Sequence, residues 1–203
     1  TLFRSNDILV QGAQPLFFLD YLATGRLDPE VAAEVVSGVA GGCADHGVAL
    51  LGGETAEMPG FYAEGEYDLA GFIVGVVDRR RILDGGWVRE GDVLVGLPST
   101  GLHTNGYSLA RRVLFETMGL GPDDHLDELG RTVAEELLRV HRCYLGPLWP
   151  LLEEGCVHAL AHVTGGGLTD NLPRVLPEGL SARIKVGAWE IPEIFRLLHR
   201  RGE

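Results

Sequence analysis

The sequence predicts two units of the α/β or α+β class, and three observations lead to this expectation. Short apolar runs that are typical of strands alternate with segments in which apolar residues recur at helical spacing. Glycine-rich polar stretches join these segments, and glycine supplies 29 of the 203 residues, as expected for a loop-rich enzyme. No repeat of fixed period and no low-complexity segment interrupts the pattern. We expect the units to comprise residues 1–97 and 98–203.

The first unit is expected to contain one long helix and two strands. Asp28-Pro29-Glu30 combines an N-cap residue, a proline at the first helical position and an acidic first turn, and Gly47 is placed to end the helix. Apolar runs predict a short strand at residues 48–51 and a central strand at residues 69–77. We expect a polar loop to begin between them at Gly52-Gly53-Glu54-Thr55.

The rest of the chain shows the same alternation. Helical spacing favours helices at residues 107–118, 133–140, 144–152 and 168–176 and after Pro192, with the third broken near Pro147 and Pro150. Apolar runs favour strands at residues 93–95, 157–163 and 180–186. The second unit is therefore expected to continue the α/β pattern.

The net charge of −12 and the three cysteines restrict the partners and the compartment. A negative field opposes non-specific binding to nucleic acid or an anionic membrane, so an anionic substrate needs a local binding device. The cysteines are odd in number and not closely paired, which favours reduced thiols over a disulfide framework.

No apolar run approaches the roughly 20 residues that span a bilayer. The first residues lack the order of a signal peptide, and we expect a soluble cytoplasmic protein.

Thr164-Gly165-Gly166-Gly167 is a candidate phosphate-binding loop because it lies between a predicted strand and a predicted helix. Residues without side chains let backbone N–H groups surround an anion, although a flexible turn would explain the glycines equally well. His162 directly precedes this segment and is a candidate general acid or base, with a structural histidine as the alternative. For His158 we favour the structural interpretation.

Asp7 and Glu54 offer the oxygen ligands that Mg²⁺ with nucleotide phosphates requires, and solvated carboxylates are the alternative interpretation. Residues 99–108 form a polar junction that contains His103, Asn105 and Ser108. Such a junction suits ligand recognition, although an N-cap formed by its asparagine or serine would also explain it. The chain lacks the Gly-x-x-x-x-Gly-Lys-Ser/Thr pattern, so its ATP site is not a P-loop.

Four motifs in a fixed order resemble the aminoimidazole ribonucleotide synthetase family. They are the segment from Asn6-Asp7 to Tyr21, residues 52–60, residues 99–108, and the segment from His162 through the glycines to Asn171 and Arg174. The likeness extends over nearly the whole chain from Asn6, and four ordered matches are far more specific than one. It implies a two-domain ATP-binding fold of the α/β (α+β) class, with both units incomplete in this chain.

The resemblance implies an ATP-dependent cyclo-ligase of purine biosynthesis that forms a C–N bond. In this family, Mg²⁺-ATP activates the formyl amide oxygen of formylglycinamidine ribonucleotide, and the amidine nitrogen then closes the imidazole ring. The products are aminoimidazole ribonucleotide, ADP and phosphate. The family's N-terminal unit supplies strands to a barrel shared across a homodimer. Neither nucleic acid nor a membrane is an expected partner.

The resemblance also implies roles for the residues of the motifs. The implied catalytic residues are Asp7, His103 and His162. The implied ATP-binding residues are Asn6, Asp7, Glu54 and Thr55, of which Asp7 and Glu54 are also the implied metal ligands. The implied substrate-binding residues are His103, Asn105, Thr164, Gly165, Gly166 and Gly167.

The chain departs from the family pattern at both ends. The family's N-terminal Gly-Thr-Asp segment and C-terminal glycine-rich segment are not in this sequence, and residues 1–5 do not match the small apolar residues expected before Asn6. We therefore expect the chain by itself to be inactive. Alternatives to the cyclo-ligase are another ATP-using enzyme of the superfamily, such as selenophosphate synthetase or thiamine-phosphate kinase, and a non-catalytic fragment that binds nucleotide or dimerises. The Gly-Gly-Glu-Thr-Ala-Glu-Met-Pro-Gly segment argues against the other enzymes.

Overall fold

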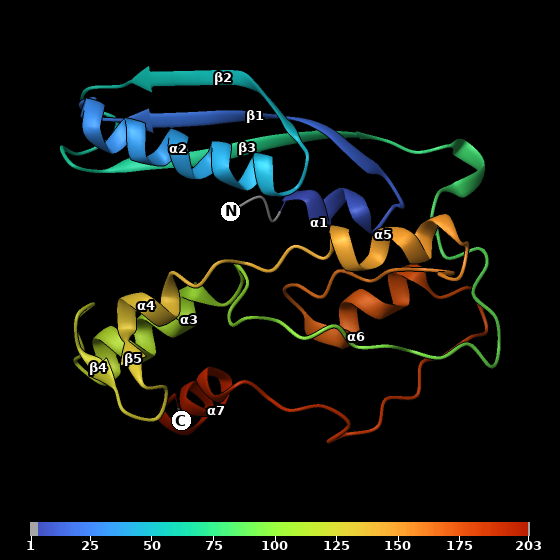
Figure 1. Ribbon diagram of the computed structural model, residues 1–203. Helices are drawn as coiled ribbons and strands as arrows, with labels where there is room; N and C mark the ends of the chain where they lie inside the picture. Colours follow the sequence, from blue (N-terminus) through green and yellow to red (C-terminus); the bar gives the residue numbers. More distant parts are fainter. Residues whose placement is uncertain (1–3, 203) are drawn as a thin grey trace. The chain divides into compact units, whose positions relative to one another are not determined.

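We describe residues 4–202 in a computed structural model (Figure 1). The chain divides into two compact units, Thr1–Trp87 with Cys143–His162, and Val88–Arg142 with Val163–Glu203. Both units combine helices with strands, which confirms the predicted α/β (α+β) class. Among the described residues, no helix combines the length and the apolar character that crossing a membrane requires.

A three-stranded sheet forms the centre of the first unit, with the strand order β2-β1-β3. The central strand β1 (Gln14–Thr24) runs parallel to β2 (Ala49–Glu57) and antiparallel to β3 (Tyr67–Val76). The strand expected at residues 69–77 is confirmed as β3. The sequence pattern does not predict β1, although its apolar and aromatic residues have strong strand propensity.

The helix expected after Asp28 is confirmed as α2 (Pro29–Asp45). The Asp28 carboxylate accepts hydrogen bonds from the backbone N–H groups of Glu30 and Val31, at 2.9 and 3.3 Å, and so satisfies donors that the helix leaves unpaired. Gly47, with φ of 64°, follows the helix and leads the chain towards β2. Helix α2 lies along one face of the sheet (Figure 1). The apolar cluster between them contains Phe18, Cys43 and Val48, with Val39, Leu50 and Ile73 packed beside them.

The opposite face of the sheet exposes apolar side chains. Ile73 packs in the cluster under α2, and side chains alternate across a strand, so Phe72, Val74 and Val76 point to the other side. These three side chains keep exposed fractions of 66%, 40% and 54%. An apolar sheet face of this kind is typical of a surface that further protein covers.

Strand β2 is longer than expected. The polar loop predicted at residues 52–55 is wrong, because these residues continue β2 to Glu57. Gly53 lies opposite Asp20 of β1, and a Cβ atom at Gly53 would collide with the carbonyl oxygen of Asp20. The close pairing of the two backbones therefore requires glycine at this position and outweighs its low intrinsic strand preference.

Helix α5 (Leu145–Glu153) belongs to the first unit and contacts α1 (Arg4–Leu9). The break expected near the two prolines is wrong. Pro147 lies in the first turn, where a backbone N–H has no helical partner, and Pro150 lies inside the helix without ending it. The Arg81 guanidinium donates hydrogen bonds to the carbonyl oxygens of Leu152 and Glu153, at 2.7 and 3.2 Å, and thereby compensates the negative end of the helix.

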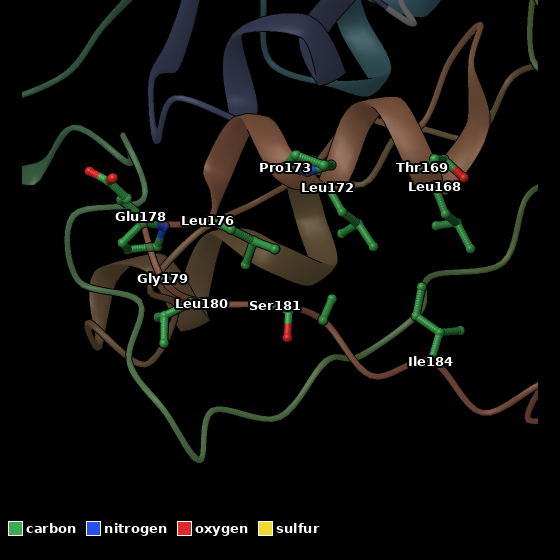
Figure 2. A pocket seen from close by; sticks show the side chains of 12 residues that line it. Leu168, Thr169, Leu172, Pro173, Leu176, Glu178, Gly179, Leu180, Ser181 and Ile184 are labelled. Carbon is green, nitrogen blue, oxygen red and sulfur yellow. The ribbon is translucent and has the colours of Figure 1, made fainter.

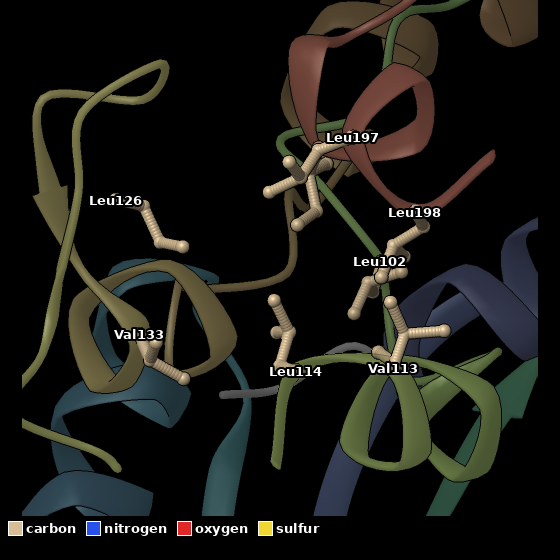
Figure 3. Close-up of a cluster of buried hydrophobic side chains, with 9 residues drawn as sticks. Leu102, Val113, Leu114, Leu126, Val133, Leu197 and Leu198 are labelled. Carbon is tan, nitrogen blue, oxygen red and sulfur yellow. The ribbon is translucent and has the colours of Figure 1, made fainter. Parts of the chain in front are cut away.

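The second unit packs its helices around an apolar core (Figure 3). The helix expected at residues 107–118 is confirmed as α3 (Tyr107–Arg111), which continues in the wider π form as η2 (Arg112–Thr117). The helix expected at residues 133–140 is the shorter α4 (Val133–Leu137), and the helix after Pro192 is confirmed as α7 (Glu193–Arg201). The strands β4 (His125–Leu126) and β5 (Arg131–Thr132) pair beside them. Core residues include Leu102, Val113, Leu114, Leu126, Val133, Leu197 and Leu198.

Three predicted strands are wrong. Residues 93–95, 157–163 and 180–186 have no strand assignment in the described chain. Val93, Val95 and Val186 have exposed fractions of 85%, 78% and 93%. A strand persists only when its backbone groups pair with a neighbour, so an apolar run alone does not make one.

The helix expected at residues 168–176 consists of α6 (Gly167–Asn171) and the 3₁₀ turn η3 (Leu172–Val175). Together with residues 176–184 they line an open pocket of about 390 Å³ (Figure 2). Figure 2 shows Leu172, Leu176 and Ile184 among its mostly apolar walls. The described residues of the second unit therefore leave an apolar surface beside the glycine loop.

Candidate active-site residues

Helix α1 carries the first two candidate residues, Asn6 and Asp7. Residues 1–3 lie outside the described residues, whereas Ser5, which the family pattern does not explain, is fully buried in the helix. The Asn6 side chain is only 3% exposed, and its Oδ1 accepts a hydrogen bond from the backbone N–H of Tyr144 at 3.0 Å. Asn6 therefore holds α1 against the start of α5. The sequence gives no local signal for Tyr144, since its backbone group makes the contact.

Asp7 meets His162 within the first unit. The Asp7 Oδ1 atom lies 3.2 Å from His162 Nδ1, and the side chains are 37% and 25% exposed. A carboxylate at Nδ1 orients the imidazole ring and favours the tautomer that carries its proton on that nitrogen. The structure thus joins the first and fourth motifs through a pair suited to proton transfer. His162 was expected on a strand at residues 157–163 and does not lie on one, so its predicted setting is wrong.

Glu54 and Thr55 lie on β2, opposite Tyr21 and Leu22 of β1, and both are exposed. No group of three or more His, Cys, Asp or Glu residues in the described chain has an arrangement that could hold a metal ion. The described carboxylates therefore do not form a complete metal site by themselves. The ATP and metal roles of Asp7 and Glu54 remain predictions.

His103 occupies a tightly held turn in the second unit. Its Nε2 atom accepts hydrogen bonds from the backbone N–H groups of Thr100 and Arg142, at 2.9 and 3.2 Å. Two backbone donors at one ring nitrogen require that nitrogen to be unprotonated, so the ring proton lies on Nδ1. His103 and Thr104 have φ of 51° and 67°, a left-handed conformation that costs about 1–3 kcal/mol for each non-glycine residue. Contacts around the turn must offset this strain.

Neither Asn105 nor Ser108 caps the following helix, so the capping interpretation is wrong. The N-cap of α3 is Gly106, and no side chain accepts a hydrogen bond there. Asn105 instead donates from Nδ2 to the His103 carbonyl oxygen at 3.2 Å. Its side chain braces the turn that carries His103, which is consistent with a role in recognition.

The glycine loop is organised by Asn171, which is 2% exposed. Its Nδ2 donates to the carbonyl oxygens of Gly165 and Gly167, at 3.2 and 2.7 Å. Gly166 has φ of 88° and Gly167 has φ of 63°, so side chains at these positions would strain the backbone. Around Gly165 and Gly167 there is space for an added Cβ atom. Hydrogen bonds therefore hold the loop in a defined conformation, which favours the binding interpretation over a flexible turn. The fourth motif already contains Asn171, which lies one helical turn after Gly167.

Glu136 is a buried carboxylate that the sequence did not single out. Its side chain is 2% exposed and lies 3.5 Å from Arg131 and 3.6 Å from Arg139. Burial raises the pKa of Glu136, against the opposing effect of the two arginines. A Cβ atom at Gly101 would lie 3.3 Å from its Oε1 atom, so Glu136 lies against the segment that precedes His103. Burial, together with the charge of Glu136, also raises the pKa of Tyr107.

Comparison with known families identifies both halves of the chain. Residues 4–77 match the N-terminal domain of AIR synthase related proteins, and residues 89–200 match the C-terminal domain of the same family. The chain belongs to the AIR synthase related protein family. This membership confirms the resemblance that the four motifs indicated, together with the predicted two-part fold.

Curated members of the AIR synthase related family with high identity carry the name phosphoribosylformylglycinamidine cyclo-ligase. The protein of Citrifermentans bemidjiense is 59% identical over 97% of this chain and 57% of its own length. Those of Geobacter metallireducens and Desulfitobacterium hafniense are 57% and 56% identical, over 57% and 58% of their own lengths and 97% and 98% of this chain. The chain therefore spans a little over half the length of these relatives.

Among solved structures, that of hydrogenase maturation protein HypE in complex with ATP matches part of this chain. It shares 18% sequence identity with this chain at a TM-score of 0.42, and the match covers 66% of this chain and 40% of that one.

Proposed function

We propose that the protein containing this chain is an ATP-dependent cyclo-ligase that converts formylglycinamidine ribonucleotide to aminoimidazole ribonucleotide, ADP and phosphate. Curated relatives that carry the name of this activity are 54–59% identical over nearly the whole chain. The observation that carries the proposal is the contact between Asp7 and His162 at 3.2 Å. Two residues far apart in the sequence meet there in a pair that can accept and hold a proton.

Ring closure releases a proton, which such a pair can accept. In the proposed reaction, the formyl amide oxygen attacks the γ-phosphorus of ATP and ADP leaves. The amidine nitrogen then attacks the activated carbon, loses a proton, and the former amide oxygen departs as phosphate. We assign the acceptance of this proton to His162, oriented by Asp7, because positioned imidazoles are the commonest general bases in proteins. The pair is partly exposed, so a substrate can reach it.

The second unit contributes recognition in this proposal. The Gly165-Gly166-Gly167 backbone, held by Asn171, is assigned to the ribose phosphate of the substrate, with Thr164 as an additional hydroxyl donor. Backbone N–H groups bind phosphate without a positive side chain, which suits a chain of net charge −12. His103 and Asn105 are assigned to polar groups of the ribonucleotide.

In this proposal, the residues that bind ATP belong to the first unit. We assign ATP binding to Asn6, Asp7, Glu54 and Thr55, as the family resemblance implies. Asp7 and Glu54 are also the proposed Mg²⁺ ligands of the whole protein, in which further donors would have to complete the set. No step assigned above to His162 depends on the metal.

The proposed architecture has a domain boundary at residue 97 and a homodimer of the whole protein. The matched ranges 4–77 and 89–200 support a division of the chain into two domains. The exposed sheet face with Phe72, Val74 and Val76 supports an association through the first unit, since a second copy could cover its apolar side chains.

We also propose a cytoplasmic location, in agreement with the free thiols of Cys43, Cys143 and Cys156.

The decisive experiment traces the formyl amide oxygen of the substrate into the products. The whole protein is given ATP and formylglycinamidine ribonucleotide carrying ¹⁸O in the formyl amide group, and the products are analysed by mass spectrometry. We expect the label in inorganic phosphate, together with one aminoimidazole ribonucleotide for each ADP. The analogue with an amide in place of the amidine should not cyclise, because it lacks the attacking nitrogen. Label retained in the organic product, or ATP hydrolysis without ring closure, would refute the proposed activity.

The dimer is tested separately by sedimentation. In the whole protein, Phe72→Lys should dissociate the homodimer, because it places a charge on the apolar sheet face. Leu138→Lys is the matched control, because Leu138 is an apolar side chain of the second unit that is at least as exposed as Phe72, at 79% against 66%. Equal behaviour of the two variants would argue against association through the sheet.

A further inference from the structure

We propose that His141 is a positioning residue for His103, which it holds in one ring orientation and one tautomer. The inference rests on the proposed function only for the role of His103 toward substrate. No motif of the sequence points to His141, and the geometry of the second unit alone suggests it. His141 is 5% exposed, so it is not placed to touch a substrate itself.

Residues 140–142 each contact the turn at residues 100–104. The Val140 carbonyl oxygen accepts a hydrogen bond from Thr100 Oγ1 at 2.8 Å, and the Arg142 N–H donates to His103 Nε2 at 3.2 Å. Between these two backbone contacts, the side chain of His141 also contacts the turn, through its ring. Substitution at His141 therefore removes its own contribution and leaves the backbone contacts available.

The His141 ring makes two contacts with the strained turn. It stacks on the His103 ring, with ring centroids 3.8 Å apart and planes inclined by 19°. Its Nδ1 atom lies 2.8 Å from the Thr104 Oγ1 atom. His103 and Thr104 are the two non-glycine residues with positive φ in the described chain, so His141 contacts the whole strained segment.

These contacts complete the orientation of His103. The backbone donors of Thr100 and Arg142 hold Nε2 at one point, about which the ring plane could still tilt. The stack defines the plane, and the Thr104 contact holds the adjoining backbone. His103 then keeps Nε2 as an acceptor and Nδ1–H as a donor in a fixed direction. Such fixed direction is what recognition of a polar substrate group requires.

The test measures the His103 ring directly in the whole protein labelled with ¹⁵N-histidine. Thr104→Val removes only the hydroxyl contact, His141→Phe keeps a flat ring without the Nδ1 atom, and His141→Asn keeps a polar acceptor without the stack. The wild-type His103 ring should show one neutral tautomer with the proton on Nδ1. We expect tautomer exchange or shifted ring signals in His141→Asn, and smaller changes in the other two variants. His125→Asn is the control, because His125 pairs with Asp127 at the surface of the same unit.

Kinetics distinguish positioning from a general loss of stability. In Thr104→Val we expect KM for the ribonucleotide to rise about five- to ten-fold, as for one lost hydrogen bond, with kcat and KM for ATP unchanged. Unaltered His103 ring signals in the folded variants would overturn the inference, as would equal changes in both KM values. If His141→Asn does not fold, Thr104→Val decides. If the wild-type protein lacks cyclo-ligase activity, the proposed function fails while the ring measurement still decides the positioning role.

Discussion

His162 and His103 illustrate two ways in which a protein holds an imidazole ring. His162 faces the Asp7 carboxylate at 3.2 Å, and both side chains are partly exposed. His103 is held by backbone N–H groups at Nε2 and by a stacked ring, in a turn with positive φ. A carboxylate can pair with either a neutral or a protonated histidine. Two N–H donors at one ring nitrogen require that nitrogen to be unprotonated, because it must accept both hydrogen bonds.

The difference separates chemistry from recognition. A ring that can gain and lose a proton next to a carboxylate is suited to general acid or base catalysis. A ring fixed in one neutral tautomer is suited to a directed hydrogen bond. The two histidines lie in different compact units, so the division of labour follows the division of the fold.

The largest effect is expected at Asp7. Asp7→Asn replaces the carboxylate by an amide that cannot stabilise a protonated His162, and we expect kcat to fall by about 10²–10⁴. Folding should survive, because the Asp7 side chain is partly exposed. Steady-state kinetics at saturating ATP and Mg²⁺ measure the effect. Turnover close to that of the wild type would remove Asp7 from the catalytic pair.

The glycine loop allows a sharper test of recognition. Gly166→Val should raise KM for the ribonucleotide by about ten-fold or more, because the loop that binds phosphate distorts. At Gly166 φ is 88° and an added Cβ atom would collide with the Asp170 side chain. Gly165→Ala is the matched variant, because no atom lies within 4 Å of an added Cβ there. We expect Gly165→Ala to affect only ligand binding, without loss of stability. A raised KM for ATP instead would assign the loop to the nucleotide.

Exchanging each histidine for glutamine compares the two sites directly. Glutamine offers an acceptor oxygen but does not relay a proton at neutral pH. His103→Gln should therefore retain kcat and raise KM for the ribonucleotide by up to about ten-fold. His162→Gln should lose turnover at unchanged KM. The same kinetic pattern in both variants would break the proposed distinction between the sites.

The smallest effect is expected from Glu136, under the His103 turn. Burial raises the pKa of Glu136 above its ordinary value of 4.5. Below that value the group is protonated in the folded and unfolded chain, and above its folded pKa it is charged in both. The free energy of unfolding therefore falls as pH rises from about 4.5 through the folded pKa.

Glu136→Gln removes this pH dependence. Relative to the wild type, the variant should gain about 1 kcal/mol in free energy of unfolding between acid and neutral pH. Denaturant melts of both proteins across that range measure the difference. Glu135→Gln, at an exposed neighbour on the same helix, is the control. If the difference has the opposite sign, the two arginines outweigh burial.

Local signals in the sequence determined the elements whose ends are set by neighbouring residues. Asp28, Pro29 and Gly47 define α2 because capping and glycine conformation act within one turn. Similar reasoning found α7 and β3, and the four motifs identified the family. The strand predictions at residues 93–95, 157–163 and 180–186 were wrong, since an apolar run does not show whether a partner strand is present.

Tertiary structure alone decided which distant residues meet. The pairing of β1 with β2 turned the glycines at 52 and 53 into strand residues, because backbone hydrogen bonds outweigh local preference. Packing brought Asp7 to His162, Asn6 to the backbone of Tyr144, and His141 onto His103. Residue types in the sequence indicated that Asp7, His103 and His162 could do chemistry. Their partners depend on contacts between segments far apart in the chain, for which local physical chemistry provides no signal.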